Sequence, residues 1–255
     1  MRLLILPAAL LLGAALYTNF PRMQEILPTL LRRGYSHVCR LFLGKDGKAD
    51  ERSAQLVFFL ALAASAILLS AIHPLIAMAA AAPLFSGFAL LPACAKVKQE
   101  LHSGAFSKDI PEYERRVIAA CAPLGDAFAH HIAAPLLLFA LGLPLSLGCA
   151  LGWVYMGLCA FDKEFPWCSR VLRPIRQAGE TALVSLLLLC AGLVGRNPLR
   201  VGGKSASEKL MHLLCLEGDV DHAPIAGDIT QAIFLCCLSA ALLCGLLSAI
   251  ILFLL

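Results

Sequence analysis

Charged residues are scarce in this chain. Only 15% of its 255 residues are Asp, Glu, Lys or Arg, and 60% are hydrophobic, whereas soluble domains average about 25% charged and 45–50% apolar residues. The apolar residues stand in long blocks and lack the alternation of a membrane β-barrel, and a bilayer offers no water to unpaired backbone groups. The sequence therefore predicts an all-α, polytopic helical membrane protein.

The sequence motifs of several enzyme classes are also absent. There is no phosphate-binding G-x-x-x-x-G-K-[ST], no dinucleotide fingerprint, no H-E-x-x-H and no G-x-S-x-G. The eleven cysteines contain no C-x-x-C pair, which disfavours a disulfide framework or a zinc site. The net charge of +4 is modest, and no basic patch interleaved with aromatic residues indicates a nucleic-acid surface. The lipid bilayer is thus the expected partner, and no metal-ligand set is predicted.

The apolar blocks predict about five to seven membrane segments within one integral membrane domain, residues 1–255. The segments are expected at 1–20, 53–72, 74–95, 117–141, 143–161, 180–195 and 228–255. The first is interpreted as an uncleaved transmembrane helix, with a secretory signal peptide as the alternative. The block 117–161 is divided near Gly142-Leu143-Pro144 into two spans, or into one span and a re-entrant segment.

Polar connections separate these segments. His73-Pro74 predicts a tight hairpin with His73 capping the turn, because proline cannot continue the preceding helix. Asp228 is expected to cap the last helix, and residues 162–179 are expected to form a polar loop. Amphipathic helices are predicted at 23–42, 96–101 and 205–216. Since a hairpin places its two flanking basic connections on one side, the positive-inside rule predicts that these are cytoplasmic, in a bacterial inner membrane.

The chain carries ionisable side chains in the apolar stretch 117–155, namely Asp126, His130 and His131. Asp126 and His130 are four residues apart, which places them on one helix face. At membrane depth such groups are costly and face a bundle interior or an aqueous cavity. The alternative is a helix end at the level of the lipid headgroups, where they cost little.

The order of features along the chain resembles a known family. It runs from Ile72-His73-Pro74 through Lys96-Val97-Lys98 and Ala134-Pro135-Leu136 to Arg170 and Gly227-Asp228. This succession is similar to that of the CobD/CbiB family of cobalamin biosynthesis, the adenosylcobinamide-phosphate synthases. The resemblance implies amide formation between adenosylcobyric acid and aminopropanol phosphate, with a corrinoid substrate, ATP and Mg²⁺. It also implies contact with other membrane or cobalamin-pathway proteins.

The resemblance assigns roles to specific residues. Asp126 stands at the first acidic position of the family's E-N-T-V-D-G, and it is expected to act as base or metal ligand. His130 and His131 are expected to replace carboxylates of the family, most of which this chain lacks. The candidate substrate- and phosphate-binding residues are Arg170, Arg173 and Glu180. The two arginines are also open to interpretation as ordinary positive-inside residues.

Three functions follow from these observations. The first is a divergent amide-forming ligase of the CobD/CbiB type. The second is a non-catalytic membrane scaffold or regulatory relative on the same fold, as AmpE proteins resemble that family. The third is a small transporter, suggested only by the intramembrane Asp and His residues acting as a proton relay.

Overall fold

The structure is a computed structural model that describes residues 2–42, 51–104, 109–142, 147–194, 201–214 and 223–254. Within these ranges the chain is helical and contains no strand. Four helical stretches are long and apolar enough to cross a membrane: α3 (Glu51–Ile72), the continuous stretch Ile110–Gly142, α9 (Pro166–Leu193) and most of α11 (Ala226–Leu254). Two bent helix pairs raise this number to as many as six. The prediction of an all-α polytopic membrane protein is confirmed.

The chain folds as two compact units. Unit 1 comprises Met1–Ser86, Pro135–Ile175 and Ser248–Leu255, and unit 2 comprises Gly87–Ala134 and Arg176–Leu247. Each unit draws on segments that are distant in the sequence, so neither corresponds to one continuous half of the chain.

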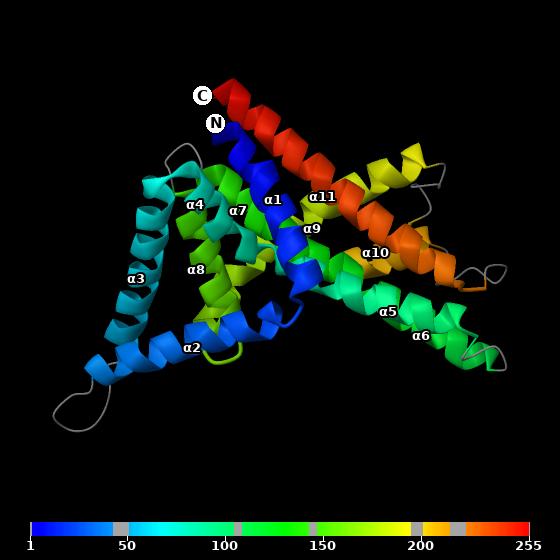
Figure 1. Ribbon diagram of the computed structural model, residues 1–255, viewed down its shortest axis with the longest axis horizontal. Helices are drawn as coiled ribbons and strands as arrows, with labels where there is room; N and C mark the ends of the chain where they lie inside the picture. Colours follow the sequence, from blue (N-terminus) through cyan, green and yellow to red (C-terminus); the bar gives the residue numbers. More distant parts are fainter. Residues whose placement is uncertain are drawn as a thin grey trace. The chain divides into compact units, whose positions relative to one another are not determined.

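Unit 1 is organised around α3. This helix packs against α2 (Met23–Leu41), α4 (Pro74–Ala81) and α8 (Gly148–Ala160), and the ribbon shows α3 beside α8 (Figure 1). The helix α1 (Arg2–Asn19) packs against α4 and the following turn η1 (Ala82–Leu84), where the Tyr17 hydroxyl donates to the Pro83 carbonyl over 2.7 Å. A bend of 103° separates α1 from α2. The amphipathic pattern of α2 is realised, since it buries Leu27 and Leu31.

Aromatic side chains join α2 and α3 to the residues that follow α8. The Tyr35 ring makes edge contacts with Phe58, Phe161 and Phe165, at centroid distances of 5.6, 5.1 and 5.6 Å. Edge-to-face pairs of this kind add about 0.5–1.5 kcal/mol beyond the buried area. Arg32 extends this link, because its guanidinium donates to the Ala160 carbonyl and pairs with Glu164 over 3.0 Å. These contacts fix α2 against the C-terminal end of α8.

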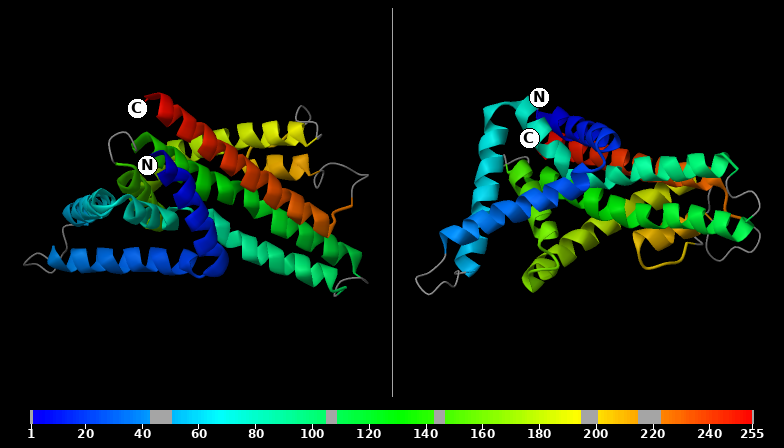
Figure 2. Two further views of the ribbon diagram at one scale, coloured as in Figure 1. Left: turned by 45° about the horizontal axis from the view of Figure 1, so that its top comes forward. Right: turned by 60° about the horizontal axis from the view of Figure 1, so that its bottom comes forward.

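Unit 2 is organised around α6 (Ile110–Phe128). It lies beside α5 (Leu90–His102) in every view (Figures 1 and 2), and α10 (Ala206–Leu213) packs on it as well. The Cys94 thiol donates to the Ala120 carbonyl between α5 and α6 over 3.5 Å. On α11, the Ser239 hydroxyl contacts the Cys190 sulfur of α9 over 3.5 Å.

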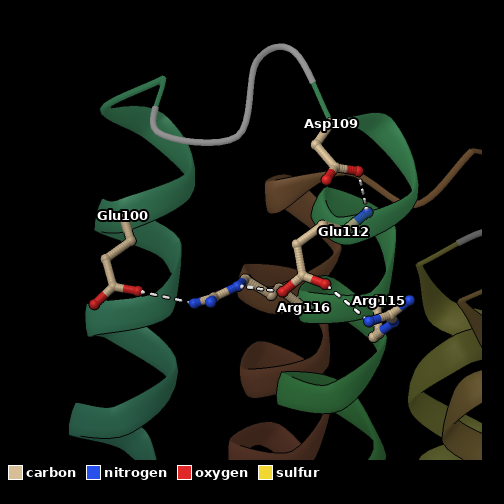
Figure 3. A network of polar contacts seen from close by, with 5 residues as sticks. All are labelled: Glu100, Asp109, Glu112, Arg115 and Arg116. Carbon is tan, nitrogen blue, oxygen red and sulfur yellow. Dashed lines mark hydrogen bonds and ion pairs between the residues drawn. The ribbon is translucent and has the colours of Figure 1, made fainter.

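An ionic network joins the polar ends of α5 and α6 (Figure 3). The Arg116 guanidinium lies between Glu112, one turn away at 2.9 Å, and Glu100 of α5 at 3.4 Å. Arg115 pairs with the other oxygen of Glu112, and the Asp109 carboxylate caps α6 by accepting from the Glu112 N–H. The network is partly exposed, which suits the end of a hairpin near the polar face of a bilayer.

Several expected boundaries differ from the structure. The segment 143–161 appears as α8, whose 13 residues span only about 20 Å and are too short for a hydrocarbon core of about 30 Å. The expected loop 162–179 and span 180–195 are joined, because α9 begins at Pro166 and continues to Leu193. Proline suits a first helical position, and good helix formers follow it. Residues 143–146 of the proposed division lie outside the described residues.

The helix caps were predicted with mixed success. His73 caps α4 as predicted, its Nδ1 accepting from the Leu75 N–H over 3.2 Å. Asp228 lies inside the first turn of α11 instead of before it, and its carboxylate reaches back to the Ile225 N–H over 2.8 Å. This is the acidic half of a capping box. The predicted amphipathic helix 205–216 is α10, with Ser205 as its N-cap.

Candidate functional site

The helix that carries the candidate residues changes its winding where they occur. After α6 ends at Phe128, residues Ala129–Ala133 form the π-helical segment η3, and α7 (Ala134–Gly142) follows. Pro135 at the start of α7 has no N–H and its ring collides with the carbonyl one α-turn earlier, which explains why the preceding turn is wider. Single π turns inside α-helices are frequent at functional sites. Both His130 and His131 belong to this turn.

Two glycines allow other backbone segments to approach η3 closely. A side chain at Gly179 of α9 would place its Cβ 2.7 Å from the Ala129 carbonyl oxygen, and one at Gly87 would lie 2.8 Å from the Ile132 side chain. Both distances are shorter than real Cβ contacts, so only glycine fits at these positions. The wide turn is therefore in direct contact with α9 and with the residues preceding α5.

The approach of α9 at Gly179 brings ionisable side chains to the histidines. Arg176 lies about one turn before Gly179, and Glu180 is the residue directly after Gly179. The charges of Arg176, Asp126 and Glu180 all act on His130, and those of His130 and Arg176 act on His131. We call Asp126, His130, His131, Arg176 and Glu180 the polar cluster. All five belong to unit 2, and the four other than Arg176 are residues that the sequence singled out.

Asp126 is bound at one side of this cluster by α10. The Ser207 N–H donates to Asp126 Oδ1 over 3.1 Å, and the Asp126 N–H donates to Ser207 Oγ over 2.9 Å. Ser207 lies in the first turn of α10, whose N–H groups have no partner within the helix. Gly125 makes the approach possible, because a Cβ there would lie 2.6 Å from the backbone of Ala206. At least one oxygen of Asp126 is therefore occupied in holding α10.

Arg170 and Arg173 do not belong to this cluster. They lie on the first half of α9 within unit 1 and both are exposed. Arg176, the next arginine along α9, is the one that enters the polar cluster. Its spacing of four residues from Glu180 was the available sequence signal, because i and i+4 side chains are neighbours on a helix. The capping-box pattern of Ser205 and Glu208 indicates where α10 begins, but no sequence signal pairs Ser207 with Asp126.

The resemblance implies Mg²⁺ and ATP, so the polar cluster would have to supply ligands that suit Mg²⁺. Magnesium prefers oxygen ligands in an octahedral arrangement, whereas this cluster offers two imidazoles, a guanidinium and two carboxylates, one of which is bound to Ser207. Across the described parts of the chain, no group of three or more His, Cys, Asp or Glu side chains is arranged to hold a metal ion. The polar cluster does not fit a magnesium site.

Comparisons with known proteins do not assign the chain to a family. No protein-family model matches it, and no match was found among curated proteins or solved structures. The functional argument therefore depends on the polar cluster and on the fold that positions it.

Proposed function

We propose that the chain is a divergent, membrane-embedded relative of the adenosylcobinamide-phosphate synthases that acts on a corrinoid substrate through the polar cluster. The observation that carries the proposal is the position of His130 in a π-helical turn, where the charges of Arg176, Asp126 and Glu180 act on it. Ionisable groups inside a transmembrane segment are costly and mark substrate or proton pathways. A group of five such residues is difficult to explain by packing alone.

The side chains of the cluster suit two parts of an amide-forming reaction. The attacking amine must lose a proton, and an imidazole such as that of His130 is a suitable general base near neutral pH. The Arg176 guanidinium presents a planar fork that matches a carboxylate or a phosphate. Glu180 is placed to balance the arginine charge when no substrate is bound. The carboxyl group must also lose an oxygen when the amide forms, and ATP would supply that activation; no residue of the polar cluster is assigned to it.

The proposed orientation follows from the charge pattern. Placing the basic connections 21–53 and 96–116 in the cytoplasm of a bacterial cell satisfies the positive-inside rule. In that orientation the ionic network of Arg116 lies on the cytoplasmic side, where soluble intermediates and other proteins of the pathway would be met.

A non-catalytic scaffold is the second candidate, and the Asp126–Ser207 pair favours it. In that case the acidic residue that the family resemblance makes catalytic holds α10 against α6 and performs no chemistry. The transporter interpretation has no comparable contact in its favour.

Complementation tests the proposal. The chain would be expressed in a bacterium that lacks its own adenosylcobinamide-phosphate synthase, and cobalamin-dependent growth would be scored. We expect growth with the unaltered chain and with Arg40→Gln, an exposed charge removed from unit 1, and no growth with His130→Gln or Arg176→Gln at equal membrane levels. Absence of growth with the folded, unaltered chain would overturn the enzyme and favour the scaffold.

Asp126→Asn separates the two roles of that residue. The amide oxygen still accepts from the Ser207 N–H, but it cannot act as a base. Growth with this variant would assign Asp126 to holding α10, and loss of growth with unchanged thermal stability would assign it to the chemistry.

A further inference from the structure

Unit 1 contains a pocket that the proposed function does not use. It has a volume of about 380 Å³ and lies among α3, α8 and α9, within the range of about 300–1,000 Å³ of small-molecule sites. Its lining residues are Arg52, Gln55, Leu56, Phe59, Val154, Leu158, Trp167 and Val171. All of them belong to unit 1, and none belongs to the polar cluster.

Close packing of α3, α8 and α9 forms the pocket walls. Gly157 lets α8 lie directly against α3, since a Cβ there would be 3.0 Å from the Phe59 ring and 3.1 Å from Leu62. The Phe59 ring meets Trp167 of α9 edge-on, at a centroid distance of 5.6 Å. The Trp167 indole N–H donates to Gln55 Oε1 over 3.0 Å. These contacts fix the three helices beside the mostly apolar space of the pocket.

The polar groups of the pocket are confined to one end of α3. Arg52 and Gln55 belong to its first two turns, whereas Leu56 and Phe59 continue toward the apolar middle of the helix. On α9, Trp167, Arg170 and Val171 have the spacing i, i+3 and i+4, so Arg170 shares a face with two lining residues. Arg52 and Trp167 both line the pocket and are exposed, so a cation and an indole lie at its rim, and the exposed Arg170 is about one turn from Trp167 on α9.

This rim has the composition of a bilayer interface. Tryptophan concentrates at the headgroup level, and arginine there attracts anionic lipids. The helix α3 is a candidate span with only 11% of its apolar window buried, so lipid is what covers most of it. The Leu56 side chain, which lines the pocket, is 64% exposed. The pocket therefore opens toward the acyl chains of the bilayer. Its cationic rim lies at the depth of the lipid phosphates.

We propose that this pocket, which we call the α3–α8–α9 pocket, binds one anionic phospholipid. An acyl chain occupies the space along Leu56, Phe59 and Val154, and the headgroup phosphate pairs with Arg52 and Arg170. Charge-assisted hydrogen bonds from guanidinium to phosphate are strong and directional, which gives preference for an anionic over a zwitterionic lipid.

Native mass spectrometry of the detergent-purified full chain tests this inference. Phosphatidylglycerol and phosphatidylcholine would be titrated separately, and the fraction of protein retaining one lipid would be measured. We expect phosphatidylglycerol to be retained preferentially. Arg52→Gln should weaken its binding roughly tenfold through the lost pair, and Val154→Trp should abolish it by filling the pocket.

Matched variants control for charge and bulk. Arg40→Gln removes another exposed arginine, from α2, and Leu68→Trp adds the same ring to α3 at a position that is 67% exposed and outside the pocket. Both should retain the lipid as the unaltered chain does. Equal losses in Arg40→Gln and Arg52→Gln, or equal retention of the two lipids, would overturn the proposal. Displacement of phosphatidylglycerol by inorganic phosphate would instead identify a site for free phosphate.

Discussion

Asp126 and Ser207 each bind the backbone N–H group of the other, although 81 positions separate them in the sequence. The exchange joins the C-terminal part of α6 to the first turn of α10, and Gly125 makes it possible by leaving no side chain between the two backbones. The residue for which the family resemblance predicts a catalytic role is thus a structural link of unit 2.

This pair predicts different effects for two substitutions of Asp126. Asp126→Ala leaves the Ser207 N–H without an acceptor and should cost about 1–3 kcal/mol of stability. Asp126→Asn keeps an acceptor oxygen and should cost less than half of that. Thermal unfolding in detergent, followed by circular dichroism, measures both. Ser207→Ala removes the other hydrogen bond, from the Asp126 N–H to the Ser207 hydroxyl, and should lower the stability separately. An Asp126→Ala variant as stable as the unaltered chain would contradict the pair.

The close approach of α9 to η3 predicts that Gly179→Ala is destabilising. The added methyl group would meet the Ala129 carbonyl at 2.7 Å, and such overpacking costs about 1–3 kcal/mol. Gly245→Ala in α11 is the matched control, because no atom lies within 4 Å of its Cβ position. Alanine in a helix should leave stability unchanged or raise it by up to about 1 kcal/mol. Equal effects of the two substitutions on the melting temperature would refute this explanation.

The network of Arg116 predicts a salt-dependent link between α5 and α6. Arg116→Gln removes pairs with both Glu100 and Glu112, whereas Arg115→Gln removes only one pair, whose arginine side chain is 76% exposed. Exposed pairs contribute less than about 1 kcal/mol each because solvent screens them. We expect Arg116→Gln to lower the melting temperature more than Arg115→Gln at low salt. The difference should shrink at 1 M salt, where the Debye length is about 3 Å; a salt-independent difference would show another cause.

The start of α10 should lose order in acid. The backbone N–H of Lys204 donates to the Glu208 carboxylate, and this hydrogen bond lowers the Glu208 pKa below its ordinary value of 4.5. A lowered pKa in the folded state means that the contribution is present above pH 4.5 and is lost as the pH falls through the folded value. Hydrogen exchange of α10, corrected for the intrinsic pH effect, should therefore accelerate as the pH falls below 4.5 and through the lowered pKa of Glu208. Glu208→Gln should remove this dependence, and a variant that retains it would contradict the assignment.

Prediction from the sequence succeeded where local pattern decides the structure. Long apolar blocks predicted the membrane helices, and His73 before Pro74 predicted a cap that α4 confirms. It failed where helix formers continue through polar residues, as in α9, whose first half was expected to be a loop. Arg176 was not selected among the basic residues near it, because its role depends on the approach of α9 at Gly179. Contacts between distant segments leave little trace in one sequence.

The π-helical turn at Ala129–Ala133 also bears on how this chain should be aligned with others. Its wider turn holds one residue more than an α-turn. One inserted residue is therefore accommodated here, and the helices before and after the turn keep the same sides buried. Deleting one residue between 129 and 133 should restore a regular helix, whereas the same deletion near Val117 would rotate the buried face of α6 by about 100°. A relative with a regular helix here would differ by a one-residue gap, and an ungapped alignment would misplace every residue from Ala134 onward.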